Sequence, residues 1–543
     1  MHQPDLILEN ANIQTMDPAC ASACSVALAG SRIHSLSSDP GHRIPAPPGT
    51  RRIDLEGRLV LPGFFDSHFH YYQWAMGRTA LCLEKAVSFR HCMEMIHDSC
   101  LAAPKNKELT WIQGQGFNES DWPENRTPTR HDLDLVCPDL PVLIWRCDLH
   151  LAVANTKALE ISRLFQHSPD YLQGLLERDE HGSLTGVLRE EGINAVKKHA
   201  PEPDLRLART IMEKAQSALH ALGITAVHDV RLSGNQSEAA LTFRSWQSLR
   251  QKDRLRLRCW TSIPGEDRHL AESMGLRTGF GDEYLRVGHL KYFMDGGMGA
   301  RTAWMLDPYA DTRTTGLCLI PREEMLEEVI KADQAGLAVM VHAIGDRAAR
   351  ELVSVFEQSR TYRLPGSVPP AMSHRLEHIQ VIRPRDLQQL SRLGMPASVQ
   401  PANMLLDINM IDRCAGQAGR YAYNFRSMLD AGLPVMFSSD CPVCDPNPLT
   451  GIQAAVTRTR NNGTPRGGWN PDQRVSLIQA LAAYTSTPAR VYRVWSELGS
   501  ITPGKLADLI VFRDSPFEAD PLFIHACRVD MTIFNGKIVY ELT

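Results

Sequence analysis

The chain has 543 residues, of which 22% are charged and 43% hydrophobic, and its 58 basic and 62 acidic side chains leave a formal net charge of −4 at pH 7. This length excludes a small binding module and is enough to bury a sizeable core. Because the charge balance implies no strongly basic face, nucleic acid is not an expected partner. No window reaches the roughly 18 consecutive apolar residues of a membrane span, so no membrane partner is expected either.

The N-terminus and the cysteines indicate the compartment. Residues 1–17 carry acids and lack the basic-then-apolar order of a secretory signal peptide. The 13 cysteines are scattered without a tight framework, which favours reduced thiols over a disulfide scaffold. We therefore expect a cytoplasmic protein.

Both ends of the chain consist of short β-rich runs broken by Gly, Pro and Asp. Residues 1–60 contain three such runs and residues 498–543 contain two, with Asn535-Gly536 as a strong hairpin signal. Neither end can bury a sheet face by itself, so we predict that they pair into one composite β-sandwich domain. The alternative is a pair of unrelated terminal hairpins.

Between the two ends, eight apolar β runs alternate with helical patterns such as 207–223 and 322–336. Buried parallel strands that alternate with helices indicate βαβ units, and eight units favour a closed barrel over an open sheet. We therefore predict an α/β protein whose residues 61–497 form a (β/α)₈ TIM barrel. The expected strands are 59–70, 223–229, 256–263, 284–295, 336–346, 372–380, 394–401 and 432–440.

The gap between the first two expected strands is too long for one connection. It holds about 150 residues, where a helix and two loops need about 30. Because the gap has strand and helix patterns of its own, we predict an inserted subdomain at about 75–205. Without it, the barrel region approaches the typical size of roughly 250 residues.

The sharpest chemical signal is His68-Phe69-His70 at the end of the first expected strand. Residues two apart on a strand point to the same face, so both imidazoles can reach one ion, and Asp66 shares that side. Taken alone the pattern is weak, because a pair of structural histidines explains it equally well.

Four further residues strengthen this signal, because each ends another expected strand: Lys291, His342, His378 and Asp440. Barrel active sites are built at that face. Imidazole and carboxylate ligands suit Zn²⁺, with Mn²⁺ or Fe²⁺ as alternatives. A metal there would activate water as hydroxide at neutral pH, and Asp440 would both bind the ion and move the proton.

Several phrases of this chain resemble the amidohydrolase superfamily, which comprises metal-dependent hydrolases on a (β/α)₈ barrel flanked by a β-sandwich of both termini. LVLPGFFDSHFH is similar to the opening motif of that superfamily. KYFMDGGMGARTAWM, VHAIGDRA, HRLEHIQ, SVQP, SSDCPV and GSITPGKLADLIVF resemble its amidohydrolase-3 branch, which includes N-substituted formamide deformylases. The resemblance covers nearly the whole chain.

The resemblance also implies roles for individual residues. It makes metal ligands of His68, His70, His342, His378 and Asp440. Lys291 would carry a CO₂-derived carbamate that bridges two metal ions. Burial near cations lowers the pKa of a lysine and so favours this chemistry. The alternative is a bare Lys291 amine that pairs with a carboxylate such as Asp295.

Three residues are softer candidates for contact with the substrate or the reaction. His228 closes the second strand and is a candidate for holding the oxyanion, although a structural role explains it equally well. His150 and Asn155 lie in DLHLAVAN, which resembles a recurring stretch of the insert in this branch. They either reach over the barrel mouth to the substrate or only order the insert.

Aromatic and basic residues near the motifs are further candidates. Tyr71, Tyr72 and Trp74 directly follow the metal motif and would wall an apolar pocket, unless they pack the insert against the barrel. Arg301, beside the glycines of 296–299, would hold a polar substrate group, with a surface ion pair as the alternative.

Cys441 and Cys444 lie directly after Asp440 in the sequence. We interpret them first as buried thiols that only contribute to packing. No second C-x-x-C with structural-zinc spacing exists, and the pair follows a strand and does not begin a thioredoxin-like helix. A nucleotide-binding glycine loop and a serine nucleophile elbow are also absent.

These observations predict a metal-dependent hydrolase that cleaves a carbon–nitrogen bond, such as an amide or formamide, of a small molecule with a metal-activated hydroxide. Two Zn²⁺ ions are the expected cofactors. One alternative is hydrolysis of a cyclic amide, carbamate or ester, or deamination, at the same centre. A non-catalytic scaffold or regulatory protein is a further alternative. The oligomeric state stays open, with a homodimer the most frequent arrangement among soluble oligomers.

Overall fold

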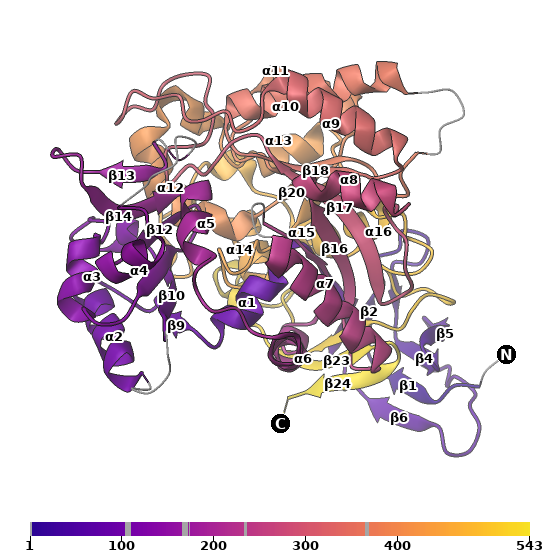
Figure 1. Cartoon of the computed structure of the whole chain (residues 1–543). Coiled ribbons are helices and arrows are strands. Elements are labelled where there is room, and N and C mark those ends of the chain that lie inside the picture. The colour runs from indigo at the N-terminus through magenta and orange to yellow at the C-terminus, as the bar shows by residue number, and fades with distance from the viewer. Residues whose placement is uncertain are drawn as a thin grey trace.

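Four β-sheets organise the described part of the chain, and the largest lies at its centre, as the computed structural model shows (Figure 1). The structure describes residues 3–103, 110–165, 172, 174–232, 236–363 and 369–542. The predicted insert and composite domain therefore include short stretches outside the described residues. Among the described residues, no helix is both long and apolar enough to cross a membrane.

The central sheet has eight parallel strands, and every expected barrel strand is present in it. Its first and last strands also meet, because the Asp440 amide donates to the His68 carbonyl at 2.9 Å. This contact closes the sheet into the predicted barrel. The strands are β8 (Phe64–Phe69), β15 (Ile224–Asp229), β16 (Arg258–Pro264), β17 (Leu285–Phe293), β18 (Val339–Ala343), β19 (Arg375–His378), β20 (Ala397–Val399) and β21 (Val435–Phe437).

The first expected strand, 59–70, divides at Gly63. Its first part is β7 (Leu59–Pro62), which pairs in a terminal sheet, and only β8 belongs to the barrel. Gly63 packs directly on Thr225, and a Cβ at this position would collide with that side chain. The chain thus passes from the terminal sheet to the barrel where only glycine fits.

Helices cover the barrel and follow local signals in the sequence. In α6 the Asp204 carboxylate accepts from the Leu207 amide as an N-cap, and α9 begins after Pro321 with Glu323 and Glu324 in its first turn. The longer barrel helices are α6 (Leu205–His220), α7 (Gln236–Gln251), α9 (Arg322–Gln334), α10 (Asp346–Ser359), α11 (Pro384–Arg392), α12 (Pro401–Cys414), α14 (Pro448–Thr457) and α15 (Leu477–Tyr484).

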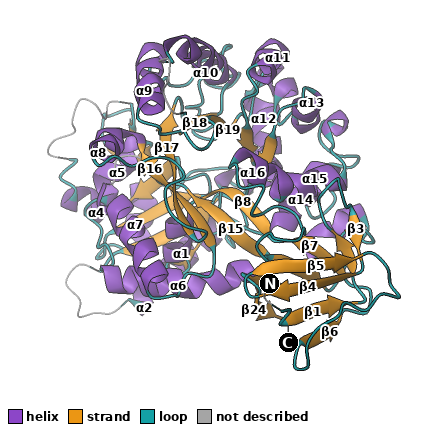
Figure 2. Cartoon of the chain, turned by 90° about the vertical axis from the view of Figure 1, so that its right-hand side faces the viewer, coloured by secondary structure: helices purple, strands orange, loops and turns teal. Residues whose placement is uncertain are grey.

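The two ends of the chain form the sandwich beside the barrel (Figure 2). One sheet has the order β5-β4-β1-β6, and the other, β24-β23-β22-β7-β2-β3, mixes strands from both ends. One apolar cluster lies between them and includes Leu8, Val26, Leu509 and Ile533. The strands are β1 (Leu6–Glu9), β2 (Asn12–Gln14), β3 (Ser22–Ala23), β4 (Ser25–Ala29), β5 (Arg32–Ser37), β6 (Arg51–Asp54), β7, β22 (Leu509–Phe512), β23 (Val529–Phe534) and β24 (Lys537–Glu541).

The insert after β8 is a subdomain with its own six-stranded sheet, of order β13-β14-β12-β11-β10-β9, on the left in Figure 1. Two apolar clusters, one on each side of the sheet, give it a core of its own. Its elements are α1 (Tyr71–Gly77), β9 (Leu81–Cys82), α2 (Phe89–Ala102), β10 (Ile112–Phe117), α3 (Arg130–Val136), β11 (Val142–Arg146), β12 (Leu151–Ala154), α4 (Thr156–Ile161), β13 (Leu176–Arg178), β14 (Leu184–Arg189) and α5 (Glu191–Lys197).

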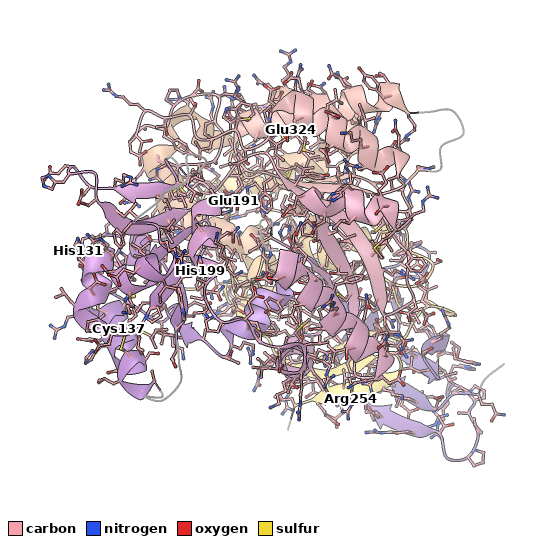
Figure 3. All side chains as sticks on the ribbon, in the orientation of Figure 1. His131, Cys137, Glu191, His199, Arg254 and Glu324 are labelled. Atoms are coloured by element: carbon pink, nitrogen blue, oxygen red, sulfur yellow. A yellow bond between two sulfur atoms is a disulfide. The ribbon has the colours of Figure 1, made fainter. Side chains whose placement is uncertain are left out.

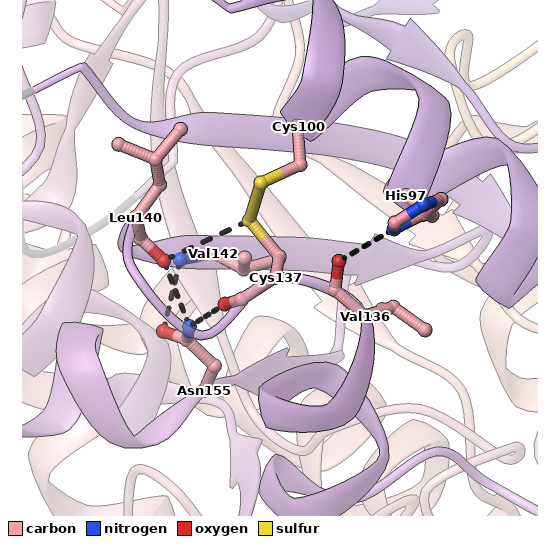
Figure 4. The surroundings of a disulfide bond; sticks show 7 residues. All are labelled: His97, Cys100, Val136, Cys137, Leu140, Val142 and Asn155. Carbon is pink, nitrogen blue, oxygen red and sulfur yellow. Dashed lines mark hydrogen bonds between the residues drawn. A yellow bond between two sulfur atoms is a disulfide. The ribbon is translucent and has the colours of Figure 1, made fainter. Parts of the chain in front are cut away.

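One feature of the insert corrects an expectation. Cys100 in α2 and Cys137 after α3 form a disulfide, with their Cα atoms 5.9 Å apart (Figure 4). The expectation of reduced thiols is therefore wrong for this pair, while the other eleven cysteines are free. Sequence spacing missed the bond because its two cysteines lie 37 residues apart, one within α2 and the other directly after α3.

The barrel interior has layers of different polarity. Near the starts of the strands, Phe65, Trp260 and Met436 join an apolar cluster with residues that follow α16 (Ser486–Val491). Above this cluster the interior turns polar, with His228 and Arg375 fully buried. The apolar end is closed by packing, so the opposite, C-terminal end of the barrel is the open one.

Candidate metal centre

Six polar side chains meet at the C-terminal ends of five barrel strands, on the floor of one cavity: His68, His70, Lys291, His342, His378 and Asp440. All are at most 5% exposed. The Asp440 Oδ1 atom lies 3.3 Å from His68 Nε2 and 3.2 Å from His70 Nε2. The His378 ring centre lies 4.9 Å from that of His68 and 4.5 Å from that of His342.

Each of the four imidazoles has one nitrogen that faces an oxygen acceptor. His68 Nδ1 meets the Glu377 carboxylate, and His70 Nδ1 lies 3.0 Å from the Val230 carbonyl. The remaining two contacts are His378 Nδ1 to Gln400 Oε1 at 2.9 Å and His342 Nε2 to the Gly296 carbonyl at 3.3 Å. Because each acceptor takes the ring proton, the other nitrogen of each ring presents a lone pair.

This arrangement fits a divalent cation. The lone pairs of His68 Nε2 and His70 Nε2 both face a carboxylate oxygen, and acceptors this close repel one another unless a cation lies among them. His68 Nε2 and Asp440 Oδ1 are buried without a hydrogen-bond partner among the described residues. Imidazole and carboxylate donors are those that bind Zn²⁺, Mn²⁺ or Fe²⁺.

Burial and neighbouring charges set the protonation states of the centre. Burial holds the pKa of His68 and His342 well below the usual range and lowers that of His378 to about 4, so these rings are neutral. Burial acts to raise the pKa of Asp440, but the nearby histidines outweigh it and keep the carboxylate ionised. Burial lowers the pKa of Lys291 to about 8.

The backbone is strained at two of these residues. His378 has φ +70° and Asp440 has φ +57°, a region that residues other than glycine rarely adopt. Alternation alone would put Glu377 and His378 on opposite faces of β19, but the strand ends at His378, where this φ breaks the regular pleat. Strain of this kind persists where the surrounding structure enforces it, commonly at functional sites.

The insert contributes one imidazole to the barrel mouth. The His150 ring centre lies 5.3 Å from that of His342, and His150 Nδ1 lies 2.8 Å from Glu190 Oε2. The other Glu190 oxygen accepts from the Thr302 hydroxyl at 2.7 Å. Burial acts to lower the pKa of His150, but Glu190 outweighs it and raises the pKa to about 9. His150 therefore faces the cavity as a cation or strong donor.

The glycines of 296–299 make room for this contact. A Cβ on Gly297 would lie 2.9 Å from His150 Cδ2, and one on Gly299 would lie 2.6 Å from both Arg146 Nη1 and Asp148 Oδ2. The insert thus packs against the loop after β17 at glycines, which have no side chain to prevent the contact.

Five expected site residues lie elsewhere, and His228 is the first correction. It does not line the cavity. Its Nδ1 lies 2.7 Å from the Tyr492 hydroxyl, and its ring centre is 5.2 Å from that of His289. His228 therefore belongs to the polar layer beneath the metal centre, because Tyr492 and the barrel interior hold it there.

Asn155 is a capping residue of the insert and not a substrate-binding one. Its Oδ1 accepts from the Val142 and Ala158 amides at 2.9 and 3.0 Å, and its Nδ2 donates to the Cys137 and Leu140 carbonyls (Figure 4). Because all its polar atoms are used at the start of α4, none remains for a ligand.

The expected aromatic and basic contacts also need correction. The Tyr71 hydroxyl donates to the Met212 carbonyl at 2.6 Å, and the Trp74 ring packs edge-on against Phe69. Both join the barrel core, and only their neighbour Tyr72 lines the cavity. Arg301 pairs with Asp311 at 2.7 Å, the ion pair that was the alternative for it.

The acids and cysteines near the motifs have structural partners. Asp66 accepts from the Ser439 amide and hydroxyl, and Asp295 accepts from the Trp304, Ile344 and Gly345 amides. The carboxylate of Asp295 is therefore bound by backbone amides, and not by the Lys291 amine that was the alternative partner. Cys441 and Cys444 are buried free thiols, and burial raises their pKa values well above the usual range.

Sequence reasoning missed the residues that orient the ligands, above all Glu377. Glu377 also accepts from Arg375 Nε, and Arg375 in turn reaches the Tyr492 hydroxyl. A period-two pattern in HRLEHIQ carried the signal, because Arg375 and Glu377 alternate with apolar Leu376 on β19. Gln400 and Glu190 gave no comparable signal, since each reaches its histidine only through the fold.

Comparison with known proteins adds the family. Residues 51–540 match the sequence profile described as "Amidohydrolase family". The chain belongs to the amidohydrolase family. It is 28% identical over 498 residues to the "Putative amidohydrolase YtcJ" of Bacillus subtilis (strain 168), with 91% of each chain covered. It is 27% identical to the "N-substituted formamide deformylase" of Arthrobacter pascens, with 99% of each covered.

A solved structure agrees with this assignment. It is an uncharacterized metal-dependent hydrolase from Pyrococcus horikoshii OT3, which shares 26% sequence identity at a TM-score of 0.74 and covers 95% of this chain and 99% of its own. The expected resemblance to the amidohydrolases and the predicted barrel fold are thus both confirmed.

Proposed function

We propose that this amidohydrolase cleaves the carbon–nitrogen bond of a small-molecule amide, with a formamide as one candidate. The observation that carries the proposal is the approach of His68 Nε2 and His70 Nε2 to the Asp440 carboxylate, with the His342 and His378 rings beside them, at the floor of an open cavity. The similarity to a formamide deformylase supports the choice of bond.

The proposed cofactors are two divalent ions, with Zn²⁺ first and Mn²⁺ or Fe²⁺ as alternatives. The residues that would hold them are His68, His70, His342, His378 and Asp440, together with Lys291 as a carbamate. Addition of CO₂ to the neutral Lys291 amine forms one N–C bond and releases one proton. Bound metal supplies an activated water and polarises the substrate carbonyl.

The chain itself supplies proton transfer and orientation. Asp440 stays ionised, so its carboxylate is able to take a proton from the attacking water and return it to the leaving nitrogen. His150 stands across the mouth from His342 and presents a donor to the substrate, with Glu190 holding its ring in place. The insert forms one wall of the cavity, with Trp145 and His150 among its lining residues.

Replacement of Asp440 by Asn tests the proposal. We expect kcat for the cleaved amide to fall by about 10²–10⁴, because the amide side chain cannot accept the proton at neutral pH. The measurement combines metal content by mass spectrometry with hydrolysis of a panel of formamides, acetamides, cyclic amides, carbamates, esters and aromatic amines.

Asp445→Asn is the matched control, since Asp445 is exposed five residues further along and does not line the cavity. Near-normal hydrolysis by a metal-loaded D440N protein would refute the mechanism. Turnover of only an ester or an aromatic amine would favour the alternative reactions, and a protein with neither metal nor turnover would be a scaffold.

A further inference from the structure

The cavity above the metal centre is much larger than an amide group. Its volume is about 1050 Å³, at the upper end of the range for ligand pockets. It extends from the metal floor between the barrel and the insert, past α5 and α9. A substrate that fills it must therefore carry a sizeable arm beyond the bond that is cleaved.

The inner walls of the cavity are apolar. Trp111, Trp145, Ile193 and Tyr72 come from the insert, and Phe293 comes from β17 of the barrel. The indole N–H of Trp111, whose residue is only 8% exposed, has no hydrogen-bond partner among the described residues. An unsatisfied buried donor on this wall is a group that a ligand acceptor would satisfy.

Carboxylates outnumber lysine and arginine side chains in the cavity lining. Apart from the metal-centre residues, eight carboxylates line the cavity, against two lysine or arginine side chains; two of the eight, Asp148 and Glu190, are paired with Arg146 and His150. Glu191 at the start of α5 and Glu324 in the first turn of α9 lie on the insert side and the barrel side (Figure 3). Neither has an ion-pair partner within the described ranges of the chain.

The two cations are already neutralised. Lys197 Nζ lies 2.5 Å from Glu238 Oε2. Arg268 pairs with Glu328 at 2.8 Å and with Glu272 at 2.7 Å. An anionic arm would thus meet a surplus of carboxylates without a free lysine or arginine to bind it, whereas a cationic arm would be attracted.

We infer that the substrate is an amide with an apolar, aromatic-sized segment next to the cleaved bond and a positively charged amine beyond it. This inference rests on the proposed function and specifies its substrate. The apolar walls bind the segment, the carboxylates at the mouth bind the ammonium group, and amides that end in a carboxylate are rejected.

Three matched arms test the inference with the metal-loaded full chain. Formamides and acetamides of para-(aminomethyl)benzylamine, para-ethylbenzylamine and para-(carboxymethyl)benzylamine share the benzylamide core and end in a cationic, a neutral and an anionic group; the amine and ethyl arms are also matched in size. We expect kcat/KM to fall from the amine to the ethyl to the carboxylate arm, with about tenfold or more between the extremes. Raising NaCl from about 0.05 to about 0.5 M should compress this order.

A double variant, Glu191→Gln with Glu324→Gln, should lower the preference for the amine arm over the ethyl arm by about two- to fivefold. Trp111→Phe should weaken binding of all three arms. Glu180→Gln is the control, because Glu180 is exposed on the β13–β14 hairpin and does not line the cavity. Equal or better hydrolysis of the carboxylate arm, or an amine-over-ethyl preference that the double variant leaves unchanged, would overturn the inference.

Isothermal titration of the same compounds separates this inference from the proposed function. If no amide is cleaved but the amine arm binds most tightly, the proposed function fails and the inferred charge selectivity stands. If the amides are cleaved but the carboxylate arm binds as tightly as the amine arm, the inferred substrate class fails alone.

Discussion

At the scale of single residues, the proposed chemistry depends on pairs of side chains. Each pair consists of a proposed metal ligand and the group that orients it. His68 is held by Glu377, and His378 is held by Gln400. The structure brings the predicted ligands together, and the sequence could place them because they end apolar strands in a regular order. Their partners could not be assigned, because a carboxylate such as Glu377 becomes a partner only when neighbouring strands bring it beside an imidazole.

Glu377→Gln should weaken metal binding by about 10–100-fold, because the neutral amide holds the His68 ring less firmly and makes it a weaker donor. Competition with a chelator measures the affinity. Glu518→Gln, on an exposed turn, is the control. Thermal unfolding of the metal-free proteins shows whether the variant is folded. An affinity within twofold of the parent in a folded variant would contradict the assigned role.

At the scale of elements, the loop after β17 positions the insert. Its glycines accept Arg146, Asp148 and His150 at distances that leave no space for a Cβ. The sequence showed the run of glycines beside Arg301 but not the segment that packs against it. The partner lies about 150 residues earlier in the chain and meets the loop only when the insert folds over the barrel mouth.

Gly297→Val should displace His150 from the mouth and lower kcat/KM by about tenfold or more, while metal content stays unchanged because the proposed ligands lie on barrel strands or directly after them. A double-mutant cycle checks the cause: in a His150→Ala background the same substitution should cost little further activity. Equal losses in both backgrounds would show that the glycine acts through something other than His150.

At the scale of the whole molecule, one buried ion pair joins the barrel to the sandwich. Arg258 on β16 binds Asp508, which precedes β22, through two contacts of 2.6 and 2.8 Å, and both residues are at most 5% exposed. Asp508 also accepts from the Asn535 amide in the C-terminal hairpin. The sandwich is thereby tied to the barrel wall.

Arg258→Met should lower the free energy of unfolding by about 3–5 kcal/mol, because it leaves the Asp508 carboxylate buried without its partner. Adding Asp508→Asn should restore part of the loss. Arg90→Met, which removes an exposed pair with Glu94, should cost less than about 1 kcal/mol. Urea unfolding monitored by circular dichroism measures all three, and a loss of similar size at positions 90 and 258 would contradict the coupling.

The sequence by itself determined the barrel, the place of the insert and the side chains that end the strands at the metal centre. These features follow from local periodicity. An alternating or wholly apolar run indicates which side chains of a strand are buried and where the strand ends. Only the tertiary structure decided which residues near the sequence motifs line the cavity. Tyr72 lines the cavity while Tyr71 packs in the core, and His150 reaches the mouth while Asn155 caps a helix. Those outcomes depend on contacts between distant segments, which no local pattern encodes.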